Sequence, residues 1–315
     1  TLARRPGLSL RIGAAFTVTA LALAVTLSAV QPRVPVASGK EAPGARVLER
    51  GEPPQQRAEA IRPDLTRAED DRGRPFEEGC HIKGDDRVES PACAYGDLRS
   101  DTTVVLFGDS HGLQYAPGMI ALAQRRGWRL ESLTRAGCTV ALVALRPRCD
   151  RWREHTLRRI ERTRPALVVV TTGTLGRYQV RDADGDRLSR KASQPLLERG
   201  MARTLRRLKA TGAKVAVIRD QPRLPFDPID CVAANLESLD RCAFAPDRPS
   251  DLAFDARAAR RVRGVRLIDP VPLLCPQGTC PSVIGNVLVY RNTYHLTATF
   301  AATLDRWLER RLPRV

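Results

Sequence analysis

Several common functional motifs are missing from this chain of 315 residues. It has no phosphate-binding loop and no dinucleotide fingerprint, which argues against a nucleotide site. Its eight cysteines and four histidines do not show the spacing of a zinc site, so we expect no metal and no bound cofactor. Aromatic residues make up only 5%, and no nucleic-acid recognition motif is present. We therefore expect no nucleic-acid partner.

The formal net charge is +17 at pH 7, and the basic excess is spread along the chain. Pairs of arginines recur inside predicted helices, which favours solvated helix faces. Attraction to an anionic cell surface or membrane is the alternative interpretation. The pairs are Arg125-Arg126, Arg158-Arg159, Arg206-Arg207 and Arg260-Arg261.

Charged residues are absent from residues 12–30, which are almost entirely apolar. As a helix this stretch would span about 28 Å, enough to cross a hydrocarbon core. Arginines within residues 1–11 place that basic segment in the cytoplasm and the rest of the chain outside. We expect a transmembrane helix here, with a signal peptide as the alternative.

Residues 31–79 are rich in Pro, Arg, Glu, Ala and Gln and show no sustained apolar period. This composition predicts a flexible extracytoplasmic tether between the membrane helix and a folded domain over 80–315. The expected location is therefore the cell membrane, with the globular domain extracytoplasmic.

The eight cysteines fall into four short-range pairs, and an exported chain would oxidise them. Nearest-neighbour pairing is our hypothesis, with free buried thiols as the alternative. The predicted disulfides are Cys80–Cys93, Cys138–Cys149, Cys231–Cys242 and Cys275–Cys280.

Short apolar segments alternate with amphipathic ones after Cys80. This order predicts an α/β fold with a parallel sheet covered by helices on both faces. Functional sites in such sheets lie at the carboxyl ends of the strands. Strands are expected at 104–107, 129–133, 166–171, 214–219 and 265–268, and helices at 112–126, 151–163, 194–211 and 297–311.

The turn Gly108-Asp109-Ser110-His111 leaves the first of these strands and opens a helix. A serine there is a candidate nucleophile, although Asp109 or Ser110 as a simple helix cap explains the fragment equally. His295 stands just before the last helix, where it can converge with Ser110 as a base.

The motifs surrounding this pair resemble those of the SGNH (GDSL-type) hydrolase family. The resemblance is closest to the SGNH domain fused to acyltransferase-3 membrane domains in bacterial cell-surface O-acyltransferases, and it implies a three-layer, flavodoxin-like fold. It leaves open whether the chain is a piece of a longer polypeptide. The motifs are CAYGD from Cys93, VVLFGDSHGLQYAPGM from Val104, AGC from Ala136, VVVTTGT, DQP from Asp220, IDPVPLLCPQGTC and VYRNTYHLT.

The resemblance implies that Ser110 is the nucleophile and His295 the base. The backbone N–H groups of Ser110 and Gly137 would hold the oxyanion, and Gly173 occupies the loop of a third donor. The family usually has Asp three residues before the histidine, where this chain has Asn292.

Three consequences of Asn292 remain open. In the first, Ser110 and His295 work as a dyad supported by Asn292 or by a backbone carbonyl. In the second, another carboxylate such as Asp269 substitutes, and in the third the domain is catalytically weak. Asp109 is expected to order the turn and His111 to line the site, whereas His81 and His155 are expected at the surface.

Three functions follow from the resemblance. The first is transfer of an acyl group, such as acetyl, from the acyltransferase-3 membrane domain through Ser110 to a hydroxyl of a cell-surface glycan. The second is a carbohydrate or lipid esterase with the same residues, and the third is a non-catalytic glycan-binding module.

Overall fold

The computed structural model describes residues 17, 34–84, 86–174, 178–246 and 253–315. Two compact units are distinguished, Thr1–Pro35 and Val36–Val315, and the second is described here. The predicted membrane helix over 12–30 lies outside the described residues apart from Thr17. Within the described residues, no helix is both long and apolar enough to cross a membrane.

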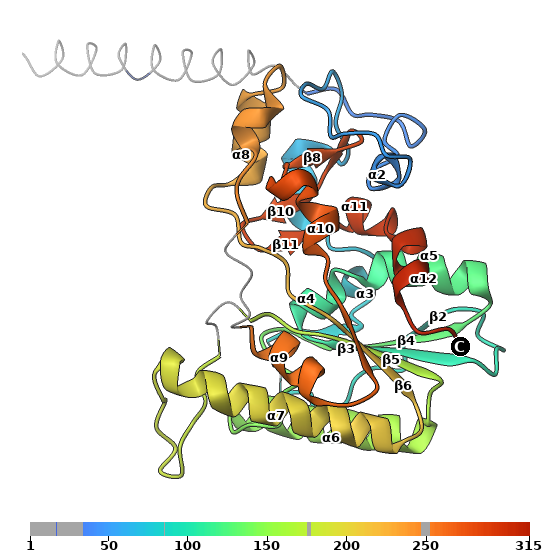
Figure 1. Cartoon of the computed structure of the whole chain (residues 1–315), viewed down its shortest axis with the longest axis vertical. Helices are drawn as coiled ribbons and strands as arrows, with labels where there is room; N and C mark the ends of the chain where they lie inside the picture. Colours follow the sequence, from blue (N-terminus) through green and yellow to red (C-terminus); the bar gives the residue numbers. More distant parts are fainter. Residues whose placement is uncertain (1–16, 18–33, 85, 175–177, 247–252) are drawn as a thin grey trace, which may run out of the picture. The chain divides into compact units, whose positions relative to one another are not determined.

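The centre of the second unit is a sheet in the order β1-β4-β3-β5-β6-β7, with β2 paired to β4 at its side (Figure 1). All pairs are parallel except β2 with β4. The strands are β1 (His81–Ile82), β2 (Ala94–Gly96), β3 (Thr103–Gly108), β4 (Arg129–Arg135), β5 (Leu167–Thr171), β6 (Lys214–Ile218) and β7 (Val265–Ile268).

Alternate residues of β3 enter two separate cores, which makes the fold three-layered. Val104 and Leu106 pack with helices α5, α11 and α12. Val105 and Phe107 pack with α6, α7 and α9 on the other face. The bounds of these helices are α5 (Ala116–Arg126), α6 (Pro147–Thr163), α7 (Arg190–Ala210), α9 (Phe254–Arg261), α11 (Ala298–Ala302) and α12 (Asp305–Arg311). The predicted α/β sheet with helices on both faces is confirmed.

Shorter elements surround this frame. Two hairpins, β8–β9 and β10–β11, lie between β7 and the C-terminal helices. The remaining elements are α2 (Arg46–Glu49), η2 (Leu65–Asp70), α3 (Arg74–Glu77), α4 (Ser110–Leu113), α8 (Pro228–Ala234), η3 (Leu239–Cys242), α10 (Val271–Leu274), η4 (Pro276–Gly278), β8 (Val283–Ile284), β9 (Val287–Leu288), β10 (Tyr290–Asn292) and β11 (His295–Leu296).

The prediction of a flexible tether over 31–79 is wrong for residues 36–79, which belong to the compact unit. Ile61 and Leu65 are buried, and the backbone of Arg62 bonds to the β8–β9 hairpin in both directions. Asp71 accepts the N–H groups of Ala298 and Thr299, which open α11. The segment has no amphipathic period because scattered apolar side chains and backbone hydrogen bonds hold it, rather than one helical face.

His81 is also not at the surface as predicted. It belongs to the edge strand β1, is 3% exposed, and its Nδ1 lies 2.9 Å from Oγ1 of Thr134. Burial lowers the pKa of His81 to about 4. The ring is therefore neutral at ordinary pH.

All four predicted disulfides are present, and the described residues contain no free cysteine. Each closes a short loop, which stabilises the fold mainly by restricting the unfolded chain.

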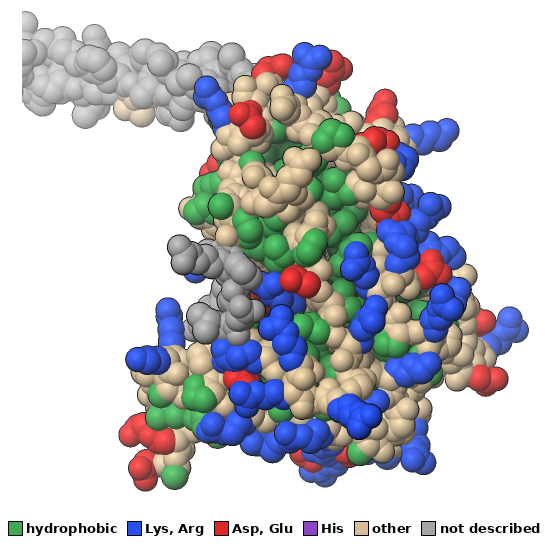
Figure 2. Space-filling model, in the orientation of Figure 1, with side chains coloured by type: hydrophobic (Ala, Val, Ile, Leu, Met, Phe, Trp, Pro, Cys, Tyr) green, Lys and Arg blue, Asp and Glu red, His purple; other side chains and the backbone are tan. Residues whose placement is uncertain are grey.

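Lys and Arg side chains cover much of the face that Figure 2 shows, including the layer of α6 and α7. Arg125, Arg158, Arg206 and Arg260 are exposed, as expected for solvated helix faces. Arg207 instead points between the two helices and pairs with both Glu154 and Glu161.

Candidate active site

Ser110 stands where β3 ends and α4 begins, at the carboxyl edge of the sheet. Gly108 lets the turn pack closely, since a Cβ there would lie 2.3 Å from the carbonyl oxygen of Thr171. Asp109 caps α4 by accepting the N–H of His111 at 2.8 Å. The cap is Asp109, so the hydroxyl of Ser110 is left for other partners.

His295 comes from the β10–β11 hairpin and meets Ser110 from the far end of the chain. Its Nε2 lies 3.0 Å from Oγ of Ser110, and the histidine is 7% exposed. This distance is that of a hydrogen bond between a nucleophile and its base.

Asn292 orients the histidine ring. Its Oδ1 lies 3.2 Å from Nδ1 of His295 and accepts the backbone N–H groups of Tyr294 (3.2 Å) and His295 (3.0 Å). Backbone N–H groups only donate, so they require the carbonyl oxygen on this side of the amide. Nδ1 therefore carries the proton, and Nε2 is left to accept the Ser110 hydroxyl.

Asp269 does not substitute for the missing carboxylate. It accepts a hydrogen bond from Nη1 of Arg219 at 2.8 Å and caps the next turn through the N–H of Val271. Among the three alternatives left open by the sequence, the geometry favours a pair supported by Asn292.

Two glutamines fix the backbone around His295. Oε1 of Gln114 accepts the N–H of Leu296 at 3.0 Å, and Nε2 of Gln114 donates to Gln221 at 2.6 Å. Gln221 in turn donates to the carbonyl of Tyr294. Gln114 and Gln221 had no expected role, although both lie in motifs of the resemblance: Gln114 in the stretch from Val104 and Gln221 in DQP.

A pocket of about 330 Å³ opens beside Ser110. Gly137 contributes to its wall with a backbone φ of +61°, a conformation that favours glycine. The N–H groups of Ser110 and Gly137 donate to no acceptor among the described residues. Both therefore remain available to an oxyanion.

Gly173 does not serve that role as expected. Its N–H donates to Oδ2 of Asp109 at 2.8 Å, alongside the hydroxyls of Thr172 (2.8 Å) and Tyr178. Asp109 is 1% exposed and is surrounded by these donors, so it orders the turn as predicted. Burial and the Asp109 charge raise the pKa of Tyr178 well above its usual value, which keeps the phenol a donor.

A model of the SGNH domain that occurs fused to AT3 domains matches residues 79–310 of this chain. The chain belongs to this SGNH family.

Two solved structures are similar to this chain at low sequence identity. The periplasmic domain of a lipopolysaccharide acetyltransferase from Salmonella ser. Paratyphi A superposes with a TM-score of 0.55 at 15% identity, covering 75% of this chain and 94% of that domain. A carbohydrate acetylesterase family member from Sinorhizobium meliloti has a TM-score of 0.38 at 14% identity, over 66% and 96% of the two chains. The search of curated proteins finds no match.

This SGNH domain also holds a buried His–Asp pair behind its serine. Nδ1 of His111 lies 2.6 Å from Oδ1 of Asp220, and both side chains are 2% exposed. Oδ2 of Asp220 accepts the N–H of Thr174 at 2.7 Å. The ring of His111 lies 4.8 Å from that of His295, centroid to centroid. His111 lines the pocket, as expected. Asp220, the first residue of the DQP stretch, supports the His111 ring, a role that the sequence did not indicate.

Proposed function

We propose that this SGNH domain transfers an acyl group, such as acetyl, through Ser110 to a hydroxyl of a cell-surface glycan. The observation that carries the proposal is the 3.0 Å contact between Oγ of Ser110 and Nε2 of His295, whose tautomer Asn292 fixes. Membership of the family supports acyl transfer or ester hydrolysis as the class of chemistry.

In the first half-reaction, Oγ of Ser110 attacks the carbonyl carbon of the acyl donor and gives its proton to Nε2 of His295. The N–H groups of Ser110 and Gly137 stabilise the oxyanion that forms. The protonated His295 then gives the proton to the leaving oxygen or sulfur, and an ester on Ser110 remains.

In the second half-reaction, a sugar hydroxyl enters the pocket beside Ser110. His295 removes its proton as the oxygen attacks the ester, and Ser110 is restored when it takes the proton back. No bound cofactor is required, because the acyl group arrives covalently attached to its donor.

The acyl donor would come through an acyltransferase-3 membrane domain, on the same chain upstream or on a separate one. Four disulfides favour an oxidising, extracytoplasmic location for the domain, as does the apolar stretch at 12–30. The lipopolysaccharide acetyltransferase domain described above is periplasmic, which supports the same placement.

Ester hydrolysis is the second candidate. It uses the same residues with water as the acceptor, and Ser110 is partly exposed, so water can reach its ester. The identity of the acceptor therefore distinguishes the two functions.

The test uses an activated acetyl ester with and without a glycan acceptor, and compares the wild type with Ser110→Ala and His295→Ala. We expect acetylated glycan from the wild type and a loss of at least about 10³-fold in both variants. Acetate release that the glycan does not reduce would establish an esterase. Equal rates of ester turnover in all three proteins would show that neither residue is catalytic. A non-catalytic glycan-binding module would then be the remaining function.

A further inference from the structure

The pocket beside Ser110 has a strongly basic lining. Two arginines, Arg146 and Arg187, belong to its walls, whereas none of the described residues that line it is acidic. Its volume of about 330 Å³ is at the small end of the range for small-molecule sites. The lining residues are Ser110, His111, Gly137, Leu145, Arg146, Tyr178, Gln179 and Arg187.

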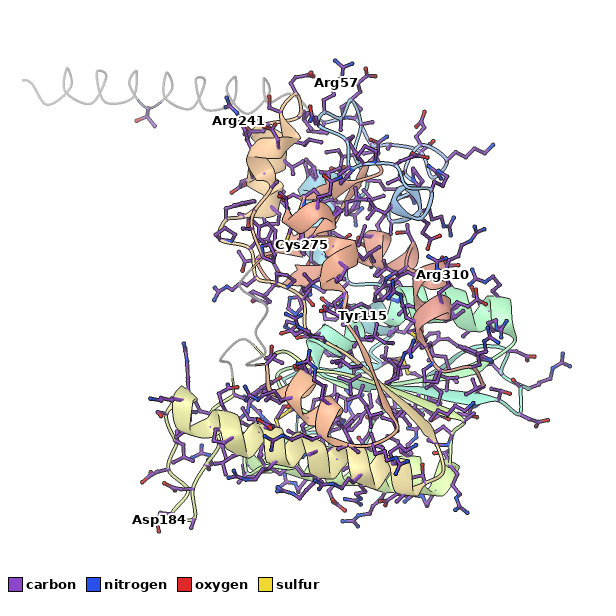
Figure 3. All side chains as sticks on the ribbon, in the orientation of Figure 1. Arg57, Tyr115, Asp184, Arg241, Cys275 and Arg310 are labelled. Atoms are coloured by element: carbon purple, nitrogen blue, oxygen red, sulfur yellow. A yellow bond between two sulfur atoms is a disulfide. The ribbon has the colours of Figure 1, made fainter. Side chains whose placement is uncertain are left out.

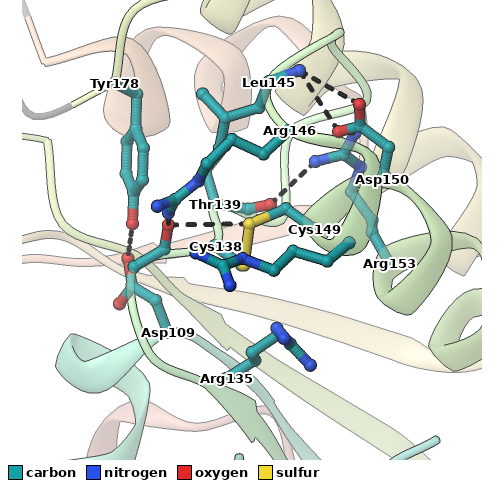
Figure 4. Close-up of a disulfide and its surroundings, with 12 residues drawn as sticks. Asp109, Arg135, Cys138, Thr139, Leu145, Arg146, Cys149, Asp150, Arg153 and Tyr178 are labelled. Atoms are coloured by element: carbon teal, nitrogen blue, oxygen red, sulfur yellow. Dashed lines mark hydrogen bonds and ion pairs between the residues drawn. A yellow bond between two sulfur atoms is a disulfide. The ribbon is translucent and has the colours of Figure 1, made fainter. Parts of the chain in front are cut away.

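Arg146 is held in place by its backbone and by its head group. Its carbonyl accepts the N–H groups of Cys149 (2.9 Å) and Asp150 (3.0 Å). Its Nη2 donates to the carbonyl of Gly137, and the Cys138–Cys149 disulfide closes the loop that contains it (Figure 4). A guanidinium has five N–H donors, so most of them remain for a ligand.

The carboxylate nearest to Arg146 in sequence is already engaged. Asp150 accepts the N–H of Leu145 and pairs with Arg153 at 2.8 Å. The charge of Arg146 is therefore not neutralised by Asp150.

Arg187 approaches from a different segment, the loop whose tip bears Asp184 (Figure 3). A β-bridge joins Arg187 to Arg181, whose Nε donates to the carbonyl of Leu145 at 3.0 Å. The loop is thereby fixed to the segment that carries Arg146. The Arg187 side chain is exposed and makes no ion pair with a described residue.

The acidic residues of that loop, which are all among the described residues, form no ion pair with Arg187. Asp182 accepts the N–H groups of Asp184 and Asp186 through Oδ1.

We propose that Arg146 and Arg187 form a subsite for an anionic sugar, in which they bind a carboxylate or phosphate on the sugar whose hydroxyl reacts at Ser110. Guanidinium groups bind both anions through paired N–H donors. The inference rests on the proposed function for its placement of the reacting hydroxyl, but binding of the anion does not depend on catalysis. The overall charge of +17 would attract an anionic glycan toward the site.

The test measures sugar binding by ligand-observed NMR to the Ser110→Ala variant, which cannot turn over. The probes are methyl galactoside, its 6-phosphate, methyl galacturonoside and inorganic phosphate. Arg146→Gln and Arg187→Gln are introduced singly into the same background. The matched control is Arg206→Gln, because Arg206 is an exposed arginine on α7 that does not line this pocket.

We expect at least one of the two anionic sugars to bind about tenfold more tightly than the neutral sugar. The anionic sugar that binds more tightly shows whether the subsite prefers a carboxylate or a phosphate. Each pocket variant should remove most of that preference, and Arg206→Gln should leave it unchanged. The proposal is overturned if neutral and anionic sugars bind alike or not at all. It is also overturned if inorganic phosphate alone binds as tightly as the sugars, or if Arg206→Gln weakens binding as much as Arg187→Gln.

The same proteins separate this inference from the proposed function. If anionic sugars bind more tightly than the neutral sugar in an arginine-dependent way, but the wild type neither transfers nor hydrolyses an ester, the proposed function is contradicted and the subsite is supported. If the wild type transfers the acyl group equally well to neutral and anionic glycans, the proposed function is supported and the anionic subsite is contradicted.

Discussion

The side-chain carbonyl of Asn292 lies 3.2 Å from Nδ1 of His295 and accepts the backbone N–H of the same histidine at 3.0 Å. One neutral oxygen therefore contacts both the ring and the backbone of this histidine. Its ring is oriented and its tautomer is set, but no negative charge faces it where an aspartate would supply one. Asn292 thus provides the geometry of a triad without its electrostatics.

Asn292→Asp should raise kcat/KM for an acetyl ester by about tenfold, which corresponds to about 1.4 kcal/mol of transition-state stabilisation. A carboxylate at this position would stabilise the imidazolium that forms as Ser110 attacks. The acid limb of the pH–rate profile should move to higher pH for the same reason. An unchanged or lower rate would mean that the neutral carbonyl is sufficient, and that the pair is not weakened.

Asp220→Asn should lower kcat about tenfold and leave KM nearly unchanged. Asp220 binds Nδ1 of His111 with one carboxylate oxygen and accepts the N–H of Thr174 with the other. An asparagine side chain has only one acceptor oxygen in place of these two. The His111 ring, which packs against His295, would lose its anchor and its nearby charge. The pH–rate profile and the melting temperature, measured on the same protein, distinguish this effect from unfolding.

The matched control for that variant is Asp269→Asn, because Asp269 pairs with Arg219 instead of contacting the site. We expect its kcat to match the wild type. A loss in Asp269→Asn as large as that in Asp220→Asn would contradict the assigned role of Asp220.

The sequence was sufficient to predict strands β3 to β7, the helices that cover them, the disulfides and the Ser110–His295 pair, but not the edge strands β1 and β2. Parallel strands such as β5 are buried on both faces and appear as apolar runs, and the turn after β3 contains a recognisable motif. Polar supports such as Gln114 and Asp220 were not predictable in the same way. Both lie in motifs of the resemblance, but their partners are a ring and a backbone group more than 100 residues away, which no local pattern indicates.

The segment before residue 79 shows the same limitation. The family match begins at 79, but Ile61, Leu65 and Asp71 hold the fold from outside it. A chain that begins at Gly79 should be destabilised by about 3–6 kcal/mol from Ile61 and Leu65 alone, which is a large part of a typical domain's stability. Urea unfolding of chains that begin at Val36 and Gly79 measures this. Equal midpoints would show that residues 36–78 do not stabilise the fold.

Stability should also depend on pH through Asp255. This buried carboxyl accepts the N–H of Asp220, and burial raises its pKa to about 7. Its folded pKa exceeds its unfolded value near 4, so the stability that it contributes is present at low pH and is lost as pH rises toward and through 7. His81, whose folded pKa is lowered to about 4, has the opposite effect below about pH 6.5.

The contribution of His81 cancels when the melting temperatures of Asp255→Asn and the wild type are compared at the same pH, because both proteins contain that histidine. The melting temperature of the variant relative to the wild type should be higher at pH 8 than at pH 5. A difference that does not change with pH would show that Asp255 is not buried as a neutral acid.

The central claim is that Ser110 carries the acyl group, and the most direct test is to trap that intermediate. The protein is mixed with an activated acetyl ester, quenched with acid within milliseconds to seconds, digested and examined by mass spectrometry. We predict one acetyl group on the peptide that contains Ser110 in the wild type, and none in Ser110→Ala or His295→Ala. Turnover of the ester without acetyl on Ser110, or the same labelling in His295→Ala, would contradict the account.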